Sequence, residues 1–316
     1  MGVNLASANF GKQYSDWPGT YGVQYVYPAP SELDYYQRRG LTLIRLPFSW
    51  ERMQPTPDGP LDAAQVAHMR AFLDAARGRG MHVVLDAQDF GRYHPFDDST
   101  VIGSAKVPIP AFQDFWTKMA AQFGNDPAVY GFDVMNEPHD MGGAKVWPAA
   151  AQAAVDGIRA VDKTTPIMVE GDTWANAATW QTYNASLNID DPSYAIVYEA
   201  HEYFDANGSG NYVQTYDQSG AYPNIGVDRL QPFVDWLNRH HARGYVGEYG
   251  VPGNDPRWLT VLDKFLAALK ADGVMGTYWA GGPWWGPTDP LSVEPINGQD
   301  KPQMAVLEKY RACVTD

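Results

Sequence analysis

The chain has 316 residues, of which 45% are hydrophobic and 13% aromatic, enough for a large buried core in one or two domains. Its formal net charge of −14 disfavours nucleic acid and anionic membranes as partners, because no basic stripe offsets the acidic excess. The sequence has no run of about 18 apolar residues, so it predicts no membrane span.

Apolar, β-branched runs alternate with longer helix-period stretches from end to end. Four glycines, at positions 40, 80, 244 and 273, precede predicted strands, as expected where a left-handed residue ends a helix. The predicted strands are 2–7, 41–48, 82–87, 130–135, 166–170, 195–200, 245–248 and 274–279. The predicted helices are 63–79, 112–123, 149–161, 230–242 and 258–271.

Eight strands separated by helices favour a closed parallel (β/α)8 barrel, for which about 250 residues is typical. The alternative, an open doubly wound sheet, usually has a Gly-rich phosphate loop after its first strand, and the sequence ANFGK at 8–12 is not such a loop. No internal repeat or linker interrupts the chain, so we predict one catalytic barrel domain, 1–316. The irregular segments 11–30 and 204–227 follow strand ends and are predicted on the catalytic rim.

Two glutamates stand where predicted strands end, Glu137 in the sequence VMNEP and Glu248 in YVGEYG. A carboxylate at the end of a buried strand is costly unless it is paired, hydrogen-bonded or functional. A retaining glycosidase needs two such groups, one to protonate the leaving oxygen and one, ionised, to attack. We therefore predict a glycosidase site with this pair at its centre.

Other polar side chains also follow predicted strands. Arg45 and Tyr203 can donate hydrogen bonds to the ionised carboxylate, and His201 suits the proton-handling partner. Asn136 could donate to a sugar hydroxyl, and the Trp279 indole offers an apolar face to a pyranose ring. Two further acids, Glu170 and Asp172, are either neighbours of the site or caps of the next helix.

Other kinds of site are less well supported by the sequence. No serine lies in a Gly-x-Ser-x-Gly elbow. His240 and His241 are adjacent in a helical pattern and therefore point apart, and the spacing of His94 from nearby aspartates fits no metal motif. The single cysteine, Cys313, excludes an internal disulfide and has no catalytic-looking neighbours. We predict no metal and no organic cofactor.

The motifs resemble glycoside hydrolase family 5, the (β/α)8 retaining enzymes that include many endo-β-1,4-glucanases. The resemblance covers some 280 residues in family order, which is far more specific than an isolated Asn-Glu-Pro. The matching pieces are GVNL at 2–5, IRLPF at 44–48, WER at 50–52, GRY at 91–93, NEP at 136–138, HEYFD at 201–205, GEYG at 247–250, YWA at 278–280 and GPWWG at 282–286.

The resemblance implies Glu137 as acid/base and Glu248 as nucleophile. It places Arg45 and Tyr203 around the nucleophile and His201 near the acid/base. It also implies that Asn136 contacts the sugar's 2-hydroxyl. The candidate substrate contacts are Gln88, Asp89, Tyr93, Trp174, Trp279, Trp284 and Trp285.

One departure concerns the third strand. The cellulase branch of the family usually has His-Asn-Tyr before Gly-Arg-Tyr, and this chain has Gln88-Asp89-Phe90. Gln88 can still donate and accept hydrogen bonds, but its reach differs, and Asp89 adds a carboxylate. Both catalytic glutamates remain, so the departure concerns the identity or linkage of the sugar.

The first hypothesis is an endo-acting, retaining β-glycanase that hydrolyses β-1,4-linked glucan by double displacement. The alternative keeps this chemistry on another β-linked polysaccharide: a bacterial exopolysaccharide, a xyloglucan or a mannan. A carbohydrate-binding protein on an inactive scaffold would typically lack a carboxylate, and a sugar-phosphate enzyme would need a Gly-rich phosphate grip. We expect a monomer with an oligosaccharide or polysaccharide substrate. We also expect secretion, because Met1 is followed at once by strand-like sequence, as if a signal peptide had been replaced.

Overall fold

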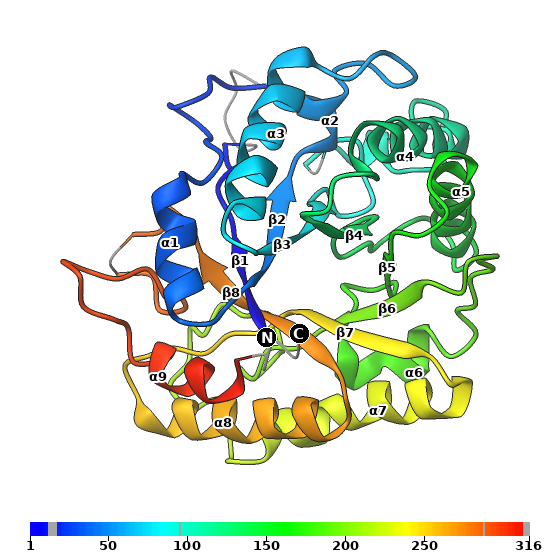
Figure 1. The fold of residues 1–316 in the computed structure, drawn as a ribbon. Helices are drawn as coiled ribbons and strands as arrows, with labels where there is room; N and C mark the ends of the chain where they lie inside the picture. The colour runs from blue at the N-terminus through cyan, green and yellow to red at the C-terminus, as the bar shows by residue number, and fades with distance from the viewer. Residues whose placement is uncertain (12–17, 95, 287, 312–316) are drawn as a thin grey trace.

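The fold is a closed barrel of eight parallel strands in chain order, surrounded by helices (Figure 1). We describe it from a computed structural model that covers residues 1–11, 18–94, 96–286 and 288–311. The predicted (β/α)8 architecture is confirmed, and each predicted strand is found within two residues at its start. The strands are β1 (Gly2–Leu5), β2 (Leu43–Phe48), β3 (His82–Ala87), β4 (Val129–Asp133), β5 (Ile167–Glu170), β6 (Ile196–His201), β7 (Arg243–Glu248) and β8 (Met275–Gly281).

All five predicted helices are present as α3, α4, α5, α7 and α8, three of them beginning three to five residues earlier than predicted. The first barrel helix, α1, was not predicted, because its only buried side chains are Leu33 and Tyr36 and its apolar pattern is therefore weak. The helices are α1 (Pro30–Arg38), α2 (Trp50–Met53), α3 (Ala63–Arg77), α4 (Ile109–Phe123), α5 (Val146–Val161), α6 (Trp180–Tyr183), α7 (Ile225–His240), α8 (Pro256–Ala271) and α9 (Met304–Leu307), with single 3-10 turns η1 (Asp98–Thr100), η2 (Ala177–Thr179) and η3 (Glu308–Tyr310).

Three of the four glycines predicted to follow helices are left-handed: Gly40, Gly80 and Gly273, with φ of 74°, 63° and 67°. The prediction for Gly244 is wrong, because this residue lies inside β7. His241, with φ of 52°, ends α7 instead. A side chain at Gly244 would collide with Leu237, so this glycine allows β7 and α7 to pack closely.

Most of the hydrophobic core lies between the barrel strands and the surrounding helices. Five tryptophans are fully buried there and are not sugar platforms: Trp50, Trp116, Trp147, Trp180 and Trp236. Two of their indoles reach strand ends near the catalytic face. Trp116 Nε1 donates to the Val134 carbonyl (2.9 Å) and Trp147 Nε1 to the Glu170 carbonyl (2.7 Å).

The inside of the barrel has two layers with different chemistry. Alternate residues of a strand face the same side. The residue two positions after an inward-facing residue therefore also faces inward and belongs to the next layer. The lower layer is a small apolar cluster of Val84, Met168, Val197 and Tyr245. Two positions further along β3, β5 and β6 stand acids, all fully buried: Asp86, Glu170 and Glu199. The strands thus carry a charged layer directly beneath the catalytic rim.

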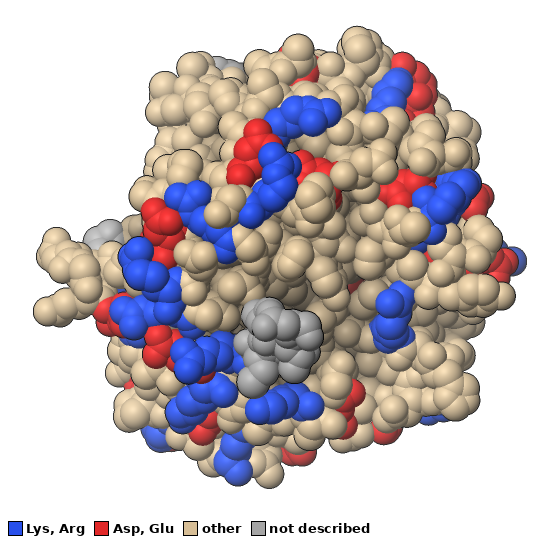
Figure 2. All heavy atoms as spheres, in the orientation of Figure 1, with Lys and Arg blue, Asp and Glu red and all other residues tan. Residues whose placement is uncertain are grey.

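Charges of both signs occur together on the surface. Figure 2 shows Lys and Arg standing next to Asp and Glu over much of one face. In the part of the chain that the structure describes, no helix has the length and apolar character needed to cross a membrane. Cys313 lies outside the described residues.

Candidate active site

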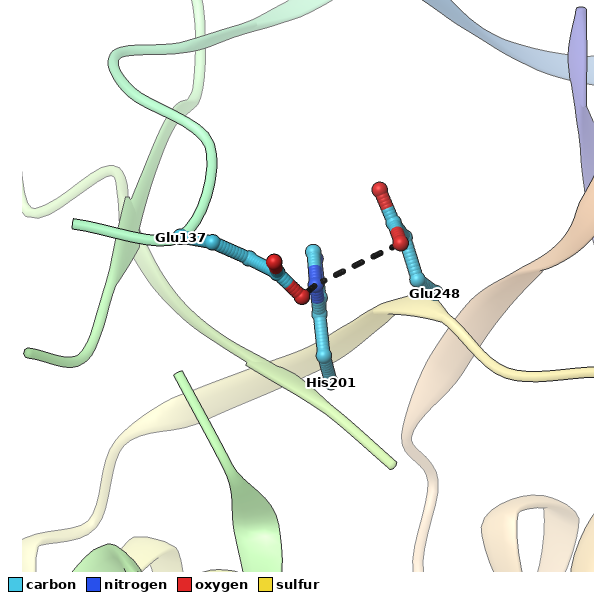
Figure 3. A group of neighbouring side chains, drawn as sticks. All are labelled: Glu137, His201 and Glu248. Carbon is cyan, nitrogen blue, oxygen red and sulfur yellow. Dashed lines mark hydrogen bonds and ion pairs between the residues drawn. The ribbon is translucent and has the colours of Figure 1, made fainter. Parts of the chain in front are cut away.

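Glu137 and Glu248 face each other at the carboxyl end of the barrel, with the His201 ring between them (Figure 3). Glu137 follows β4, and Glu248 is the last residue of β7, in register with His201 on β6. One oxygen of each glutamate and one ring nitrogen of His201 all lie within 4.8 Å of one another. Retaining glycosidases separate their two carboxyl groups by about 5 to 5.5 Å and inverting ones by about 6.5 to 9.5 Å. The closest oxygens of the pair therefore lie nearer than the inverting spacing, which fits a retaining site.

Glu248 is surrounded by hydrogen-bond donors. Arg45 Nη1 donates to its Oε1 (3.0 Å), and the Tyr203 hydroxyl donates to its Oε2 (2.8 Å). Gln88 Nε2 adds a longer contact to Oε1 (3.3 Å). Burial, and then the charge of Glu248, raise the pKa of the Tyr203 phenol, so the phenol keeps its proton and remains a donor. These contacts favour the ionised carboxylate and fix its orientation.

Glu137 has a different environment. Burial raises the pKa of its carboxyl, His201 opposes that shift, and the charge of Glu248 adds to it. His201 Nδ1 lies 2.8 Å from Glu137 Oε1. Burial lowers the pKa of His201, but the nearby charges of Glu170 and Glu248 outweigh burial and raise it well above the ordinary value, which favours the imidazolium form. Glu137 is therefore the group of the pair that suits a proton donor.

Arg45 lies at the centre of the charged layer. Besides Glu248, its guanidinium lies 2.7 to 3.3 Å from four further carboxylates, one each on β3, β4, β5 and β6. Three of these acids were not predicted as site neighbours. The four are Asp86, Asp133, Glu170 and Glu199.

Part of this layer has a spacing that could hold a cation. Glu170, Glu199 and His201 each place one atom within 4.8 Å of the others. However, the Arg45 guanidinium lies 3.0 Å from Glu170 and 3.3 Å from Glu199 and already supplies positive charge there. We therefore assign no metal site, and the absence of a cofactor stays a prediction.

Asn136 is fully buried beside the glutamates. Its Oδ1 accepts from Arg45 Nη2 (2.9 Å). Its Nδ2 has no hydrogen-bond partner among the described residues. A buried donor without a partner is costly, so this amide is available to a sugar hydroxyl, as its position beside Glu137 predicts.

The predicted aromatic contacts lie on the rim. Trp174 is 45% exposed, stacks on His139 (4.3 Å between rings) and, with Glu137, lines a cavity of about 550 Å³. Trp284 is also exposed, and Trp279 packs edge-on against Trp285 (5.9 Å). A larger hollow of about 770 Å³ lies between η1 and the segment 139–142 but contains neither catalytic glutamate.

Two predicted substrate contacts are engaged inside the protein. Asp89 is fully buried, and its Oδ2 accepts from the backbone N–H of Trp50 (2.7 Å), at the first turn of α2. The Tyr93 hydroxyl donates to the Gln54 carbonyl (2.7 Å), and its ring packs edge-on against Trp50. Both side chains therefore hold the segment after β2 against the segment after β3. Gln88, by contrast, contacts Glu248 directly.

Known proteins resemble the chain over nearly its whole length. Residues 3–284 match the cellulase family, glycosyl hydrolase family 5. The probable endo-beta-1,4-glucanase B of Aspergillus kawachii is 33% identical, over 98% of this chain and 90% of its own. The structure of Pseudomonas stutzeri endoglucanase Cel5A in complex with cellobiose is 43% identical, covers 99% of this chain and 93% of its own, and superposes with a TM-score of 0.92. The structure of the endo-beta-1,4-glucanase Xac0029 of Xanthomonas axonopodis pv. citri is 35% identical, covers 100% of this chain and 99% of its own, and superposes with a TM-score of 0.92.

Proposed function

The chain belongs to glycosyl hydrolase family 5 and is an endo-β-1,4-glucanase, and we propose that it works by double displacement with Glu248 as nucleophile and Glu137 as acid/base. The observation that carries this proposal is the asymmetry of two carboxylates within 4.8 Å. Glu248 accepts from Arg45 and Tyr203, whereas burial raises the pKa of Glu137. One carboxyl group is thus held by two hydrogen-bond donors, and the other is inclined to hold a proton.

In the first step, an oxygen of Glu248 attacks the anomeric carbon and the bond to the leaving sugar breaks. The Glu137 proton passes to the leaving oxygen, and a glycosyl ester forms on Glu248. In the second step, Glu137, now ionised, takes a proton from water while the water oxygen attacks the anomeric carbon. Glu248 leaves as a carboxylate, and both glutamates return to their starting states.

Aromatic side chains flank the glutamates and support a glucan chain lying across the barrel mouth. Trp174 lines the same cavity as Glu137. This position suits a contact with the sugar on the leaving-group side. Trp279 lies near the end of β8, the strand that follows β7 and Glu248, and Trp284 lies just beyond it. Indole faces accept the apolar faces of β-linked glucose rings. The similar Pseudomonas stutzeri structure contains cellobiose, an oligosaccharide of this kind.

Two product measurements test the proposal. Proton NMR of cellohexaose hydrolysis in its first minutes is expected to show new reducing ends as the β-anomer, since two displacements retain configuration. Initial formation of the α-anomer would contradict the role of Glu248 as nucleophile. For an endo-acting enzyme, the viscosity of carboxymethyl cellulose should fall well before reducing ends accumulate.

The contact between Gln88 and the nucleophile Glu248 can be tested by mutation. Its amide donates to Glu248 Oε1, a hydrogen bond to a charged group, which is typically worth about 1.5 kcal/mol or more. We expect Gln88→Ala to lower kcat/KM on cellopentaose about tenfold, because about 1.4 kcal/mol corresponds to a factor of ten. Gln231→Ala, which removes an exposed glutamine on α7, is the matched control and should leave the rate unchanged. Equal rates for Gln88→Ala and the wild type would show that this contact contributes nothing.

A further inference from the structure

The last residue of β5, Glu170, is fully buried beneath the catalytic pair and accepts hydrogen bonds on both oxygens. Its Oε2 accepts from the backbone N–H of Glu137 (2.6 Å). Its Oε1 accepts from Arg45 Nη2 (3.0 Å) and lies 3.2 Å from His201 Nε2. Two hydrogen-bond donors and the His201 ring, from three elements, therefore converge on one carboxylate.

Each of these three groups also contacts, or belongs to, a catalytic glutamate. His201 holds Glu137 Oε1 through Nδ1, and Arg45 holds Glu248 Oε1 through Nη1. The third group is the backbone of Glu137 itself, which has an uncommon left-handed conformation, with φ of 41°. Glu170 is in turn fixed by the bond from the Trp147 indole to its carbonyl. One side chain thus bridges both halves of the catalytic machinery.

The charged layer around Glu170 contains more acids than bases. Since only two of its neighbours are basic, the acids cannot all be ionised in a buried site. The ionisable groups that face it are Arg45 on β2, Asp86 on β3, Asp133 on β4, Glu137 after β4, Glu199 and His201 on β6, and Glu248 on β7.

The hydrogen bonds indicate which acids are neutral. The oxygens of Asp86 and Glu199 accept no hydrogen bond from the described residues, although each acid lies near Arg45. Burial raises the pKa of both well above the ordinary range. Glu170 accepts two hydrogen bonds, and burial, opposed by the charge of His201, raises its pKa to about 7. Above that pH, Glu170 therefore supplies the negative charge on the Nε2 side of the His201 ring, as Glu248 does on the Nδ1 side.

We propose that Glu170 is a positioning residue for acid catalysis, which keeps His201 in the imidazolium form and holds the backbone of Glu137. This inference rests on the proposed acid/base role of Glu137. The imidazolium stabilises ionised Glu137 through the 2.8 Å contact at Oε1. Glu170 therefore controls, through His201, the pH at which Glu137 loses its proton.

The test is Glu170→Gln. An amide has one acceptor oxygen and one NH₂ group, so in either orientation its NH₂ faces either the Glu137 N–H or the Arg45 guanidinium. His201 then loses the charge that keeps it protonated, and a neutral ring no longer stabilises the Glu137 carboxylate. The pKa of Glu137 rises, because the positive charge nearest to it is gone. We expect the basic limb of the kcat/KM profile to move to higher pH by about half a unit or more.

The rate effect should depend on the leaving group. For phenyl cellobioside, which needs acid assistance, we expect kcat/KM to fall roughly 10- to 100-fold, the size of effect that misplacing a catalytic group produces. For dinitrophenyl cellobioside, whose dinitrophenolate leaves without a proton, we expect kcat/KM to fall less than about threefold. The comparison is made on kcat/KM because this ratio reports only the first displacement. Glu170→Asp keeps the charge and should restore the position of the basic limb.

The control is Glu202→Gln. Glu202 is another buried carboxyl, at the end of β6, and burial raises its pKa to about 8. Its side chain accepts from the Ala178 N–H and lies near Arg229, and among the described residues no hydrogen bond joins this carboxyl to Glu137, His201 or Glu248. Both substrates and the pH profile should be unaffected by this change.

Two results would overturn the inference. Equal losses on both substrates with an unmoved basic limb would give Glu170 a purely structural role. In wild-type protein, ¹⁵N NMR should show both His201 nitrogens protonated at pH 8, where Glu170 is ionised, and a neutral ring there would also overturn the inference, even if Glu170→Gln fails to fold. Glu137→Ala is measured in parallel. If the loss of kcat/KM in that variant does not depend on the leaving group, the acid/base role of Glu137 is wrong, and the inference about Glu170 is wrong as well.

Discussion

Glu248→Ala is expected to lower kcat on aryl cellobiosides by about 10⁴-fold or more, the range found when a catalytic nucleophile is removed. The loss should be chemical, because the protein is expected to keep its fold. Arg45 still donates to Asp133 and Glu170, so the substitution leaves no unpaired buried cation. Removing one acid from an acid-rich layer also relieves like-charge repulsion. Thermal unfolding should therefore occur at the wild-type temperature or above it.

Azide rescue would identify the missing group. In Glu248→Ala, azide can enter the space left by the side chain and displace the phenolate from the face that Glu248 occupied. One displacement gives the α-glycosyl azide, with inverted configuration, and no ester forms. Glu308→Ala, which removes an acid that pairs with Arg39 at the surface, is the control and should keep full activity. Turnover by Glu248→Ala above about a hundredth of the wild-type rate would rule out the assignment.

Strand positions and the two glutamates could be predicted from sequence because both depend on local signals. β3 was predicted with its observed bounds, since its run of apolar and β-branched residues is short and clearly bounded. Glu137 and Glu248 end such runs, and parallel strands in a barrel bring their carboxyl ends to one rim. The sequence therefore determines which side chains meet even where it does not give their distances.

The charged layer was missed although the sequence contains a signal for it. Asp86 lies two residues after the inward-facing Val84 and two before Gln88, and Glu199 stands likewise between Val197 and His201. Acids at inward positions of apolar strands are expensive, so the alternation alone could have identified them. Their common partner, Arg45, comes from another strand, and only the closed barrel brings them together.

Other assignments depended on tertiary contacts that a motif cannot show. Asp89 and Tyr93 follow a strand end, as substrate contacts do, yet their partners are the Trp50 N–H and the Gln54 carbonyl. Both partners lie in the segment after β2, which is adjacent only in the folded barrel. Exposure separates such residues from Trp174, and exposure cannot be read from a local pattern.

Glu137→Ala should give a different pattern from Glu248→Ala. We expect kcat/KM to fall about 10²- to 10⁴-fold on phenyl cellobioside, the range for loss of general acid catalysis, and only slightly on dinitrophenyl cellobioside. With azide, the glycosyl ester on Glu248 is attacked from the face that Glu137 occupied. The product is then the β-glycosyl azide, with retained configuration. An α-azide product, or equal losses on both substrates, would contradict the role of Glu137 as acid/base.

The pH profile tests the same role through the pKa of Glu137. Burial, and the charge of Glu248, raise that pKa in the free enzyme, so the proton is held above the usual carboxyl range and the basic limb of kcat/KM should lie there. Glu137→Ala should abolish this limb. Once Glu248 is esterified, its negative charge is gone, the pKa of Glu137 falls, and the same carboxyl becomes the ionised base that the second step needs. The nearby nucleophile thus changes the acid into a base during the reaction, which explains why the two carboxylates lie within 4.8 Å of each other.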